Sequence, residues 1–166
     1  GHIGESVRYF RKHYDPKHEY DVFSFEPLPE NIVELIHIDG VQVIRKAVSI
    51  YDGYAKFYTG LPQSGSISDQ KRTGRLEGKT HINVKTIDFA YWFKDLVTGD
   101  YVPEITIKLN IEGAEYEVLD KMDQWGLLPF VHKWFVQWHW QKIGLDKSEH
   151  DRISNLIEWE SWPAMF

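Results

Sequence analysis

The chain has 166 residues, which is enough for one domain, and its 19 Lys and Arg against 25 Asp and Glu give a formal net charge of -6. This acidic balance excludes the domain-wide basic surface on which nucleic-acid binding depends, so no nucleic-acid partner is expected. The absence of cysteine excludes disulfides, thiol nucleophiles and Cys-ligated metals, and it favours a reducing, cytoplasmic location. No stretch is long and apolar enough to span a bilayer, so no membrane partner is expected.

Residues 1–166 are expected to form a single domain, and nothing in the sequence indicates its oligomeric state. The opening residues, GHIGES, lack both the basic and the apolar region of a secretory signal, and the chain does not begin with Met. We therefore expect the sequence to be a core fragment of a longer protein.

The first fifty residues alternate between helix and strand patterns. Apolar residues at helical spacing predict helices over residues 5–13 and 31–38, the second opened by Pro29. Runs rich in β-branched and aromatic residues predict strands over residues 20–25 and 41–48. This order predicts a parallel sheet with crossover helices, which is an α/β fold.

The middle of the chain contains a long segment with few large apolar residues. A strand is predicted over residues 55–58, then a surface loop over 60–80, a strand over 81–87 and a helix over 88–93. Loops of this length inside a domain are usually functional or disordered. We interpret this one either as a lid over a binding cleft or as a solvated loop.

The last third returns to the alternation of strand and helix. Strands are predicted over residues 104–111 and 131–140, and helices over 114–122 and 148–159. The last helix is predicted to open with a capping box formed by Ser148 and Asp151.

A glycine-containing loop directly precedes the first predicted helix. Such a loop lets the backbone approach a ligand, while free N–H groups at the helix start point outward. Glu26 ends the next predicted strand, where nucleotide-binding α/β folds place a carboxylate on the ribose hydroxyls. The alternatives are an ordinary turn for the loop and a solvated strand end for Glu26.

Polar residues also follow two later strands, in the segments KLNIEGAE (108–115) and QWH (137–139). Ligands of open α/β sheets bind outside the carboxyl ends of the strands, so both segments are candidates for a site. Strand alternation predicts that Phe135, Gln137 and His139 share one face, opposite Trp134, Val136, Trp138 and Trp140. The alternative for His139 is a hydrogen-bonded structural histidine.

Together the segments GHIGES, FEPLPEN, KAVS, TID, KLNIEGAEYEVL and FVQWHWQKIGL resemble those of the FkbM-type methyltransferases, in the same order. The resemblance covers residues 1 to about 145. It implies a Rossmann-like fold with a mostly parallel sheet flanked by helices, and methyl transfer from S-adenosylmethionine. Such a fold has a central strand before the glycine loop and a final antiparallel pair, so truncation at both ends is expected.

The resemblance also implies roles for individual residues. The cofactor would contact Gly1, His2, Ile3, Gly4 and Glu5 at its methionine end, Glu26 at its ribose, Pro27, Lys46, Ala47 and Val48 at its adenine, and Asn110 at its sulfonium. The acceptor side would include Ser66 in the predicted loop, Gln137, His139 and Glu112. No metal ion is expected.

Two positions depart from the family pattern, which usually has Asp at position 110 and Glu at position 137. Asn110 and Gln137 keep the shape of these side chains but remove the charge and the ability to accept a proton. The candidates for a catalytic base are then His139 and Glu112, with Asn110 orienting the reacting groups.

Three functions are compatible with these observations to different degrees. The leading hypothesis is an S-adenosylmethionine-dependent O-methyltransferase that acts on a small hydroxylated or sugar-like acceptor. The alternative is a catalytically degenerate module that binds S-adenosylmethionine without turnover, in keeping with Asn110 and Gln137. A nicotinamide oxidoreductase is disfavoured, because the loop lacks the GxGxxG spacing.

Overall fold

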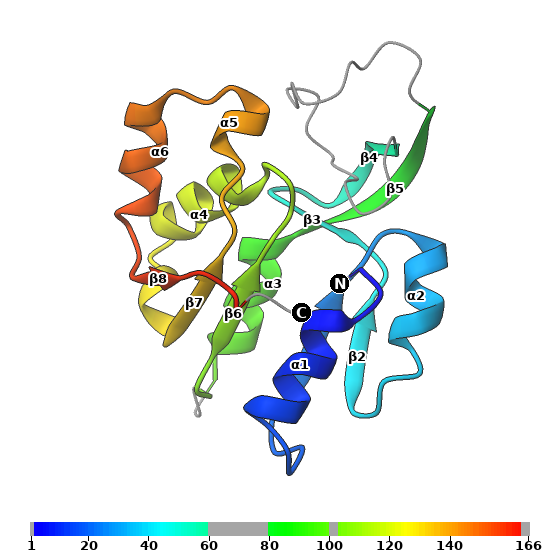
Figure 1. Ribbon diagram of the computed structural model, residues 1–166. Coiled ribbons are helices and arrows are strands. Elements are labelled where there is room, and N and C mark those ends of the chain that lie inside the picture. The colour runs from blue at the N-terminus through cyan, green and yellow to red at the C-terminus, as the bar shows by residue number, and fades with distance from the viewer. Residues whose placement is uncertain (1, 60–79, 100–102, 164–166) are drawn as a thin grey trace.

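The computed structural model describes residues 2–59, 80–99 and 103–163 (Figure 1). Gly1 and nearly all of the predicted loop over 60–80, including Ser66, lie outside the described residues. Within those ranges, every helix is too short or too polar to cross a membrane.

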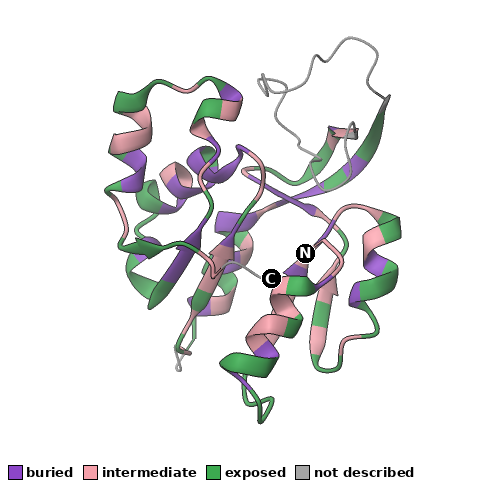
Figure 2. Ribbon diagram, in the orientation of Figure 1, coloured by how far each residue is buried: buried purple, intermediate pink, exposed green. Residues whose placement is uncertain are grey.

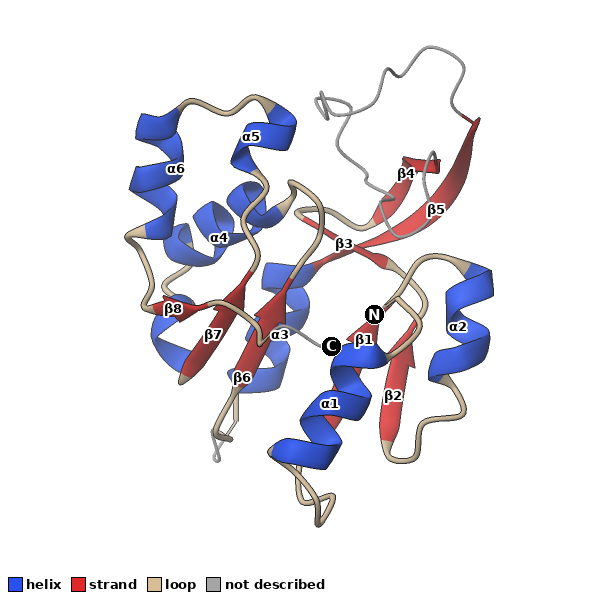
Figure 3. Ribbon diagram, in the orientation of Figure 1, coloured by secondary structure: helices blue, strands red, loops and turns tan. Residues whose placement is uncertain are grey.

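Helices and strands alternate along most of the chain (Figure 3). The helices are α1 (Glu5–His13), α2 (Pro29–Leu35), α3 (Phe89–Val97), α4 (Glu115–Gln124), the short 3-10 helix η1 (Leu128–Phe130), α5 (Trp140–Ile143) and α6 (Lys147–Ser154). The strands are β1 (Val22–Phe25), β2 (Val41–Ile44), β3 (Ala47–Ser49), β4 (Gly53–Thr59), β5 (Thr80–Asp88), β6 (Thr106–Leu109), β7 (Lys133–Val136) and β8 (Trp159–Glu160).

The described strands form three separate sheets, with the orders β1-β2, β3-β5-β4 and β6-β7-β8. Every pair is parallel except β4 with β5, which form an antiparallel hairpin. The structure confirms the predicted α/β class, in which parallel strands are flanked by helices. The strand after the last helix, β8, pairs with β7 in parallel, where the resemblance implied an antiparallel pair.

The main core lies where α3 and α4 pack against β6 and β7 (Figure 2). Its most deeply buried side chains include Phe93, Leu119, Met122 and Ile153, each at most 1% exposed. Fully burying one such side chain contributes about 1.5–3 kcal/mol relative to leaving it in water. The carboxyl ends of β6 and β7 are therefore held by the best-packed part of the molecule.

A buried ion pair connects α1 to the sheet formed by β1 and β2. The guanidinium of Arg11 pairs with the carboxylate of Asp15 and donates hydrogen bonds to the carbonyl oxygens of Tyr20, at 3.1 Å, and Gly40, at 2.7 Å. Tyr20 precedes β1 and Gly40 precedes β2. The Arg11 side chain therefore joins α1 to the segments that lead into both strands. Because the pair is almost fully buried, removing either partner would leave an uncompensated charge.

Four predicted strands are shorter in the structure than in the sequence pattern. Those over 20–25 and 104–111 are trimmed at their ends to β1 and β6, and the other two differ more. The run over 41–48 breaks at Arg45 and Lys46 into β2 and β3, which belong to different sheets. The run over 131–140 ends at Val136. The amide of Gln137 makes a last bond to the carbonyl of Leu109, at 3.0 Å, and the backbone then turns into α5. The alternation of faces predicted beyond Val136 is therefore wrong.

The last helix is also shorter than predicted, and its capping box is wrong. The helix begins at Lys147 with Asp146 as its N-cap, so Ser148 lies inside the first turn. Asp151 instead pairs with Lys147, one turn earlier, at 2.5 Å. After Ser154 the chain leaves the helix, because Trp159 and Glu160 pair with β7 as β8.

Gly4 is the N-cap of α1 and adopts a positive φ of 83°. A Cβ atom at this position would lie 2.4 Å from Cδ1 of Ile38 and 3.1 Å from Cδ2 of Leu35. Glycine is favoured here by its backbone conformation, and an added Cβ would also require the end of the Ile38 side chain to shift.

We expect Gly4→Ala to lower the free energy of unfolding by about 2–4 kcal/mol, the sum of the left-handed backbone cost and of overpacking. Urea denaturation measures this change. Gly126→Ala is the matched control, since Gly126 has a φ of 65° and open space at its Cβ position. Equal losses in the two variants would show that contact with Ile38 is unimportant.

Candidate functional site

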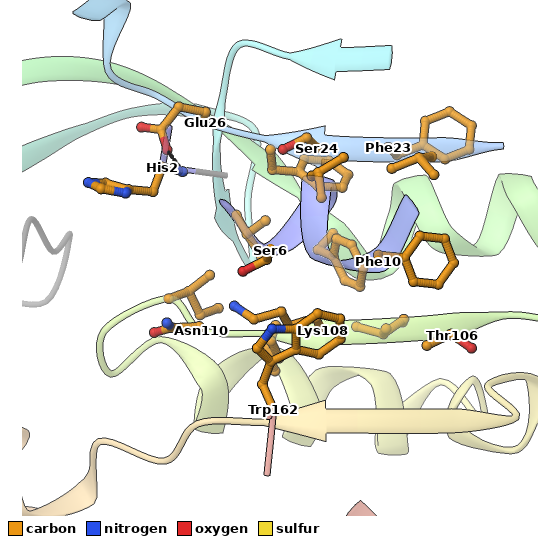
Figure 4. Close-up of a pocket in the computed structure, with 18 of the residues that line it drawn as sticks. His2, Ser6, Phe10, Phe23, Ser24, Glu26, Thr106, Lys108, Asn110 and Trp162 are labelled. Atoms are coloured by element: carbon orange, nitrogen blue, oxygen red, sulfur yellow. Dashed lines mark hydrogen bonds between the residues drawn. The ribbon is translucent and has the colours of Figure 1, made fainter. Parts of the chain in front are cut away.

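A cavity of about 1570 Å³ lies between β1 and β6 (Figure 4). At one end it is lined by the loop before α1 and by the segments that follow β1, β6 and β7. We call this the polar end, and its residues are His2, Ile3, Glu26, Pro27, Asn110, Ile111, Glu112 and Gln137. The structure thus brings together segments from four parts of the sequence, since parallel strands end at the same edge.

The charge around the cavity is mainly negative. The acidic side chains that line it are Glu5, Glu19, Asp21, Glu26, Glu30, Glu104 and Glu112. Among the described lining residues Lys108 is the one Lys or Arg, and burial lowers the pKa of its ammonium group below the usual value. Such a lining favours a ligand that carries positive charge.

Glu26 links the glycine-containing loop to the end of β1. Its side chain is buried, and its carboxylate accepts hydrogen bonds from the backbone amide of His2, at 2.5 Å, and from that of Leu28, at 3.0 Å. Figure 4 shows the first of these bonds beside the cavity. Glu26 therefore shapes the loop around the polar end as well as lining it.

Glu115 organises the loop between β6 and α4. Its carboxylate is fully buried and accepts hydrogen bonds from the amides of Ile111, at 2.8 Å, and Gly113, at 2.7 Å. Between these two amides Glu112 adopts a positive φ of 58°, which is uncommon for a residue with a side chain. The two bonds hold this conformation and so fix where the Glu112 side chain begins.

His139 lies behind the polar end and does not line the cavity. Its side chain is buried, with Nδ1 2.8 Å from a carboxylate oxygen of Glu115 and Nε2 3.6 Å from one of Glu112. The other Glu112 oxygen lies 3.5 Å from Nζ of Lys142. Of the two candidate bases, only Glu112 lines the cavity.

Asn110 and Gln137 contact each other at the polar end, where the amide nitrogen of Asn110 donates to the amide oxygen of Gln137 at 3.1 Å. Two ionised carboxylates at this separation would repel strongly unless a proton or a cation lay between them. Two amides attract instead. The pair of Asn110 and Gln137 is therefore stable without a third partner, whereas the Asp and Glu that the resemblance implies at these positions would not be.

The remaining predicted site residues divide into three groups. Pro27, Ala47, Val48 and Glu5 line the cavity. Lys46 and Gly4 do not: the ammonium of Lys46 lies 3.2 Å from a carboxylate oxygen of Asp52, and Gly4 packs against Ile38. Gly1 and Ser66 lie outside the described residues.

Sequence reasoning missed two residues of the site, Lys108 and Glu115. Both stand in the KLNIEGAE segment, which was recognised as a whole. The position of Glu115 two residues after Gly113 and at a helix start is the signal that indicates a carboxylate bonded to loop amides. Lys108 has a weaker signal, a charged residue within a buried strand, and its ammonium lies 5.7 Å from the Trp162 ring.

We expect Glu115→Gln to lower the free energy of unfolding by about 1–3 kcal/mol, because charge-assisted bonds from two amides and His139 are lost. Thermal or urea denaturation measures the loss. Glu117→Gln is the matched control, an exposed carboxylate on the same helix. If both variants were equally stable, the loop would not depend on the Glu115 carboxylate.

Comparison with known families agrees with the geometry of the polar end. A family model described as the methyltransferase FkbM domain matches residues 1–160. Comparisons with curated proteins and with solved structures gave no significant match. The matched range covers nearly the whole chain and includes the loop before α1, Glu26 and the KLNIEGAE segment, so the resemblance is confirmed. The chain belongs to the FkbM methyltransferase family.

Proposed function

We propose that the protein is an S-adenosylmethionine-dependent methyltransferase that acts on a hydroxyl oxygen of a small hydroxylated or sugar-like acceptor. The observation that carries this proposal is the polar end of the cavity. It gathers the loop before α1, Glu26 and the segment Asn110–Glu112 within an acidic lining. Membership of a methyltransferase family supports the reaction type. A cytoplasmic location stays a prediction.

The residues of the polar end fit the chemistry of this cofactor, whose sulfonium supplies the methyl group. Acidic lining suits a cationic sulfonium, and Glu26 supplies a carboxylate for ribose hydroxyls. Pro27, Ala47 and Val48 provide apolar surface for a purine. His2 and Ile3 would border the methionine end.

Glu112 is the residue that we assign to the acceptor hydroxyl. It lines the cavity, whereas His139 and Lys142 contact its carboxylate from behind. Glu112 would accept the proton of the hydroxyl, and His139 would keep the carboxylate in place. Asn110 and Gln137 would hold the acceptor by hydrogen bonds. Because their mutual bond uses one atom of each amide, the Asn110 oxygen is left as an acceptor and the Gln137 nitrogen as a donor.

A second candidate function is cofactor binding without turnover. The amide pair of Asn110 and Gln137 favours it, because neither side chain accepts a proton. Both candidates predict binding of S-adenosylmethionine, so consumption of the cofactor in the presence of an acceptor distinguishes them. We favour the active enzyme, since methyl transfer depends mainly on alignment and Glu112 lines the cavity.

We expect Glu26→Gln to weaken binding of S-adenosylmethionine more than tenfold, roughly 2 kcal/mol, because a charged acceptor for two hydroxyls is lost. Isothermal titration calorimetry measures the affinity. Glu30→Gln, an exposed carboxylate on the wall of the same cavity, removes the same charge and should bind almost normally. Unchanged affinity in Glu26→Gln would remove Glu26 from the cofactor site.

We expect the native chain to transfer methyl groups in the presence of a chelator, because its amide pair needs no cation. The double variant Asn110→Asp with Gln137→Glu should instead depend on a divalent cation or on acid pH, since its two carboxylates repel. Release of S-adenosylhomocysteine from a panel of hydroxylated acceptors measures both. A silent native chain beside an active double variant would show that the native chain has lost catalysis.

A further inference from the structure

His139 has one ring nitrogen without a hydrogen-bond partner among the described residues. This atom, Nε2, is buried, and the charged group that it contacts is a carboxylate oxygen of Glu112, 3.6 Å away. Support of the loop after β6 does not need Nε2, because Nδ1 alone contacts Glu115. A buried polar atom without a hydrogen bond costs free energy, so it calls for an explanation in the chemistry of the site.

The contact with Glu115 determines which nitrogen of His139 carries the hydrogen. The Glu115 carboxylate already accepts hydrogen bonds from two amides of the loop, and an ionised carboxylate can only accept. Nδ1 of His139 lies 2.8 Å from one of its oxygens and therefore donates. A neutral His139 then has its hydrogen on Nδ1 and a lone pair on Nε2, which makes Nε2 a proton acceptor that faces Glu112.

The Nε2 atom and the Glu112 oxygen next to it form a site for one proton. When both atoms are unprotonated, a lone pair faces a negatively charged oxygen at 3.6 Å, and the two repel each other. A proton on either atom makes the contact attractive. The described charged groups around this site come from three segments: Glu112 from the loop after β6, Glu115 from α4, and Lys142 from α5, whose ammonium lies 3.5 Å from the other Glu112 oxygen.

We propose that Glu112 and His139 form a proton relay, which carries the proton of the acceptor hydroxyl from the cavity to Nε2 of His139. The O–H bond of the acceptor breaks as a bond to a Glu112 oxygen forms, and the proton then moves from Glu112 to Nε2. The resulting imidazolium lies between the carboxylates of Glu112 and Glu115, which attract its charge. His139 is thus a positioning residue that acts through Glu112.

The relay deepens the proposed function and rests on it for the reaction. Methyl transfer from a sulfonium to a neutral hydroxyl removes one positive charge from the polar end and releases one proton. Because the relay keeps that proton beside the same carboxylates, the net charge of the polar end is the same before and after the reaction. A positively charged ligand at the polar end should therefore favour the relay without its proton, and a neutral ligand should favour the relay with it.

The first test compares binding of S-adenosylmethionine, whose sulfur is positively charged, with binding of S-adenosylhomocysteine, whose sulfur is neutral. Isothermal titration calorimetry in buffers of different ionisation enthalpy, repeated across the pH range in which the chain is folded, measures the protons taken up. We expect S-adenosylhomocysteine to take up more protons than S-adenosylmethionine, with a largest difference of about one per site. Glu112→Gln and His139→Asn should each abolish this difference, since Asn keeps an N–H for Glu115 but has no second nitrogen. The matched control Glu30→Gln should keep it.

The second test is an NMR titration of the chain alone, which needs neither cofactor nor acceptor. We expect the signals of Nε2 of His139 and of the Glu112 carboxyl carbon to change at the same pH, because the two groups share one proton. Changes at two different pH values, or an Nε2 atom that never changes its protonation in the folded chain, would overturn the relay.

A proton difference between the two ligands that persists in both Glu112→Gln and His139→Asn would also overturn the relay. If neither ligand bound to the native chain, the proposed function would be wrong, and the NMR titration alone would support or overturn the relay. The failure of the relay and the failure of the proposed function are therefore distinguishable.

Discussion

The carboxylate of Glu115 is the constraint on which the polar end depends. It lies at the start of α4, is fully buried, and contacts the loop after β6 and the residue that opens α5. Because these two segments follow neighbouring parallel strands, one side chain fixes the relative position of both. Burying a charge costs free energy unless the charge is hydrogen-bonded. The hydrogen-bond partners of Glu115 lie in the segments that follow β6 and β7. The geometry of Glu112 and of the amide pair follows from this arrangement.

The sequence pattern predicted the elements best where local and tertiary preferences agree. Helix α1 spans Glu5–His13, the predicted range, because its amphipathic pattern is bounded by Gly4 and by a turn at Pro16. The strand predicted over 131–140 is too long, because the aromatic residues beyond Val136 are residue types that favour strands. Their actual conformation is decided by the buried contact of His139 with Glu115, which no local pattern contains.

The candidate site was predictable in outline for a topological reason. Parallel strands end at one edge, so a loop before the first helix, Glu26 and the KLNIEGAE segment had to lie near one another. The individual roles were harder to predict. Sequence alone does not tell whether a side chain lines a cavity or is buried behind it. The alternation of a strand predicted that His139 and Gln137 share one face. In the structure His139 is buried and Gln137 is exposed.

The break between β2 and β3 has a mechanical consequence. The carbonyl oxygen of Ile44 accepts hydrogen bonds from the amides of both Glu26, at 3.1 Å, and Lys46, at 2.8 Å. One peptide group therefore ties the backbone of Glu26 to the short link between two sheets. The β4–β5 hairpin extends from the second of these sheets and is joined to Ala47 and Val48 through β5 (Figure 1). A displacement of the hairpin would therefore be transmitted through β5 to Ala47 and Val48, which line the cavity.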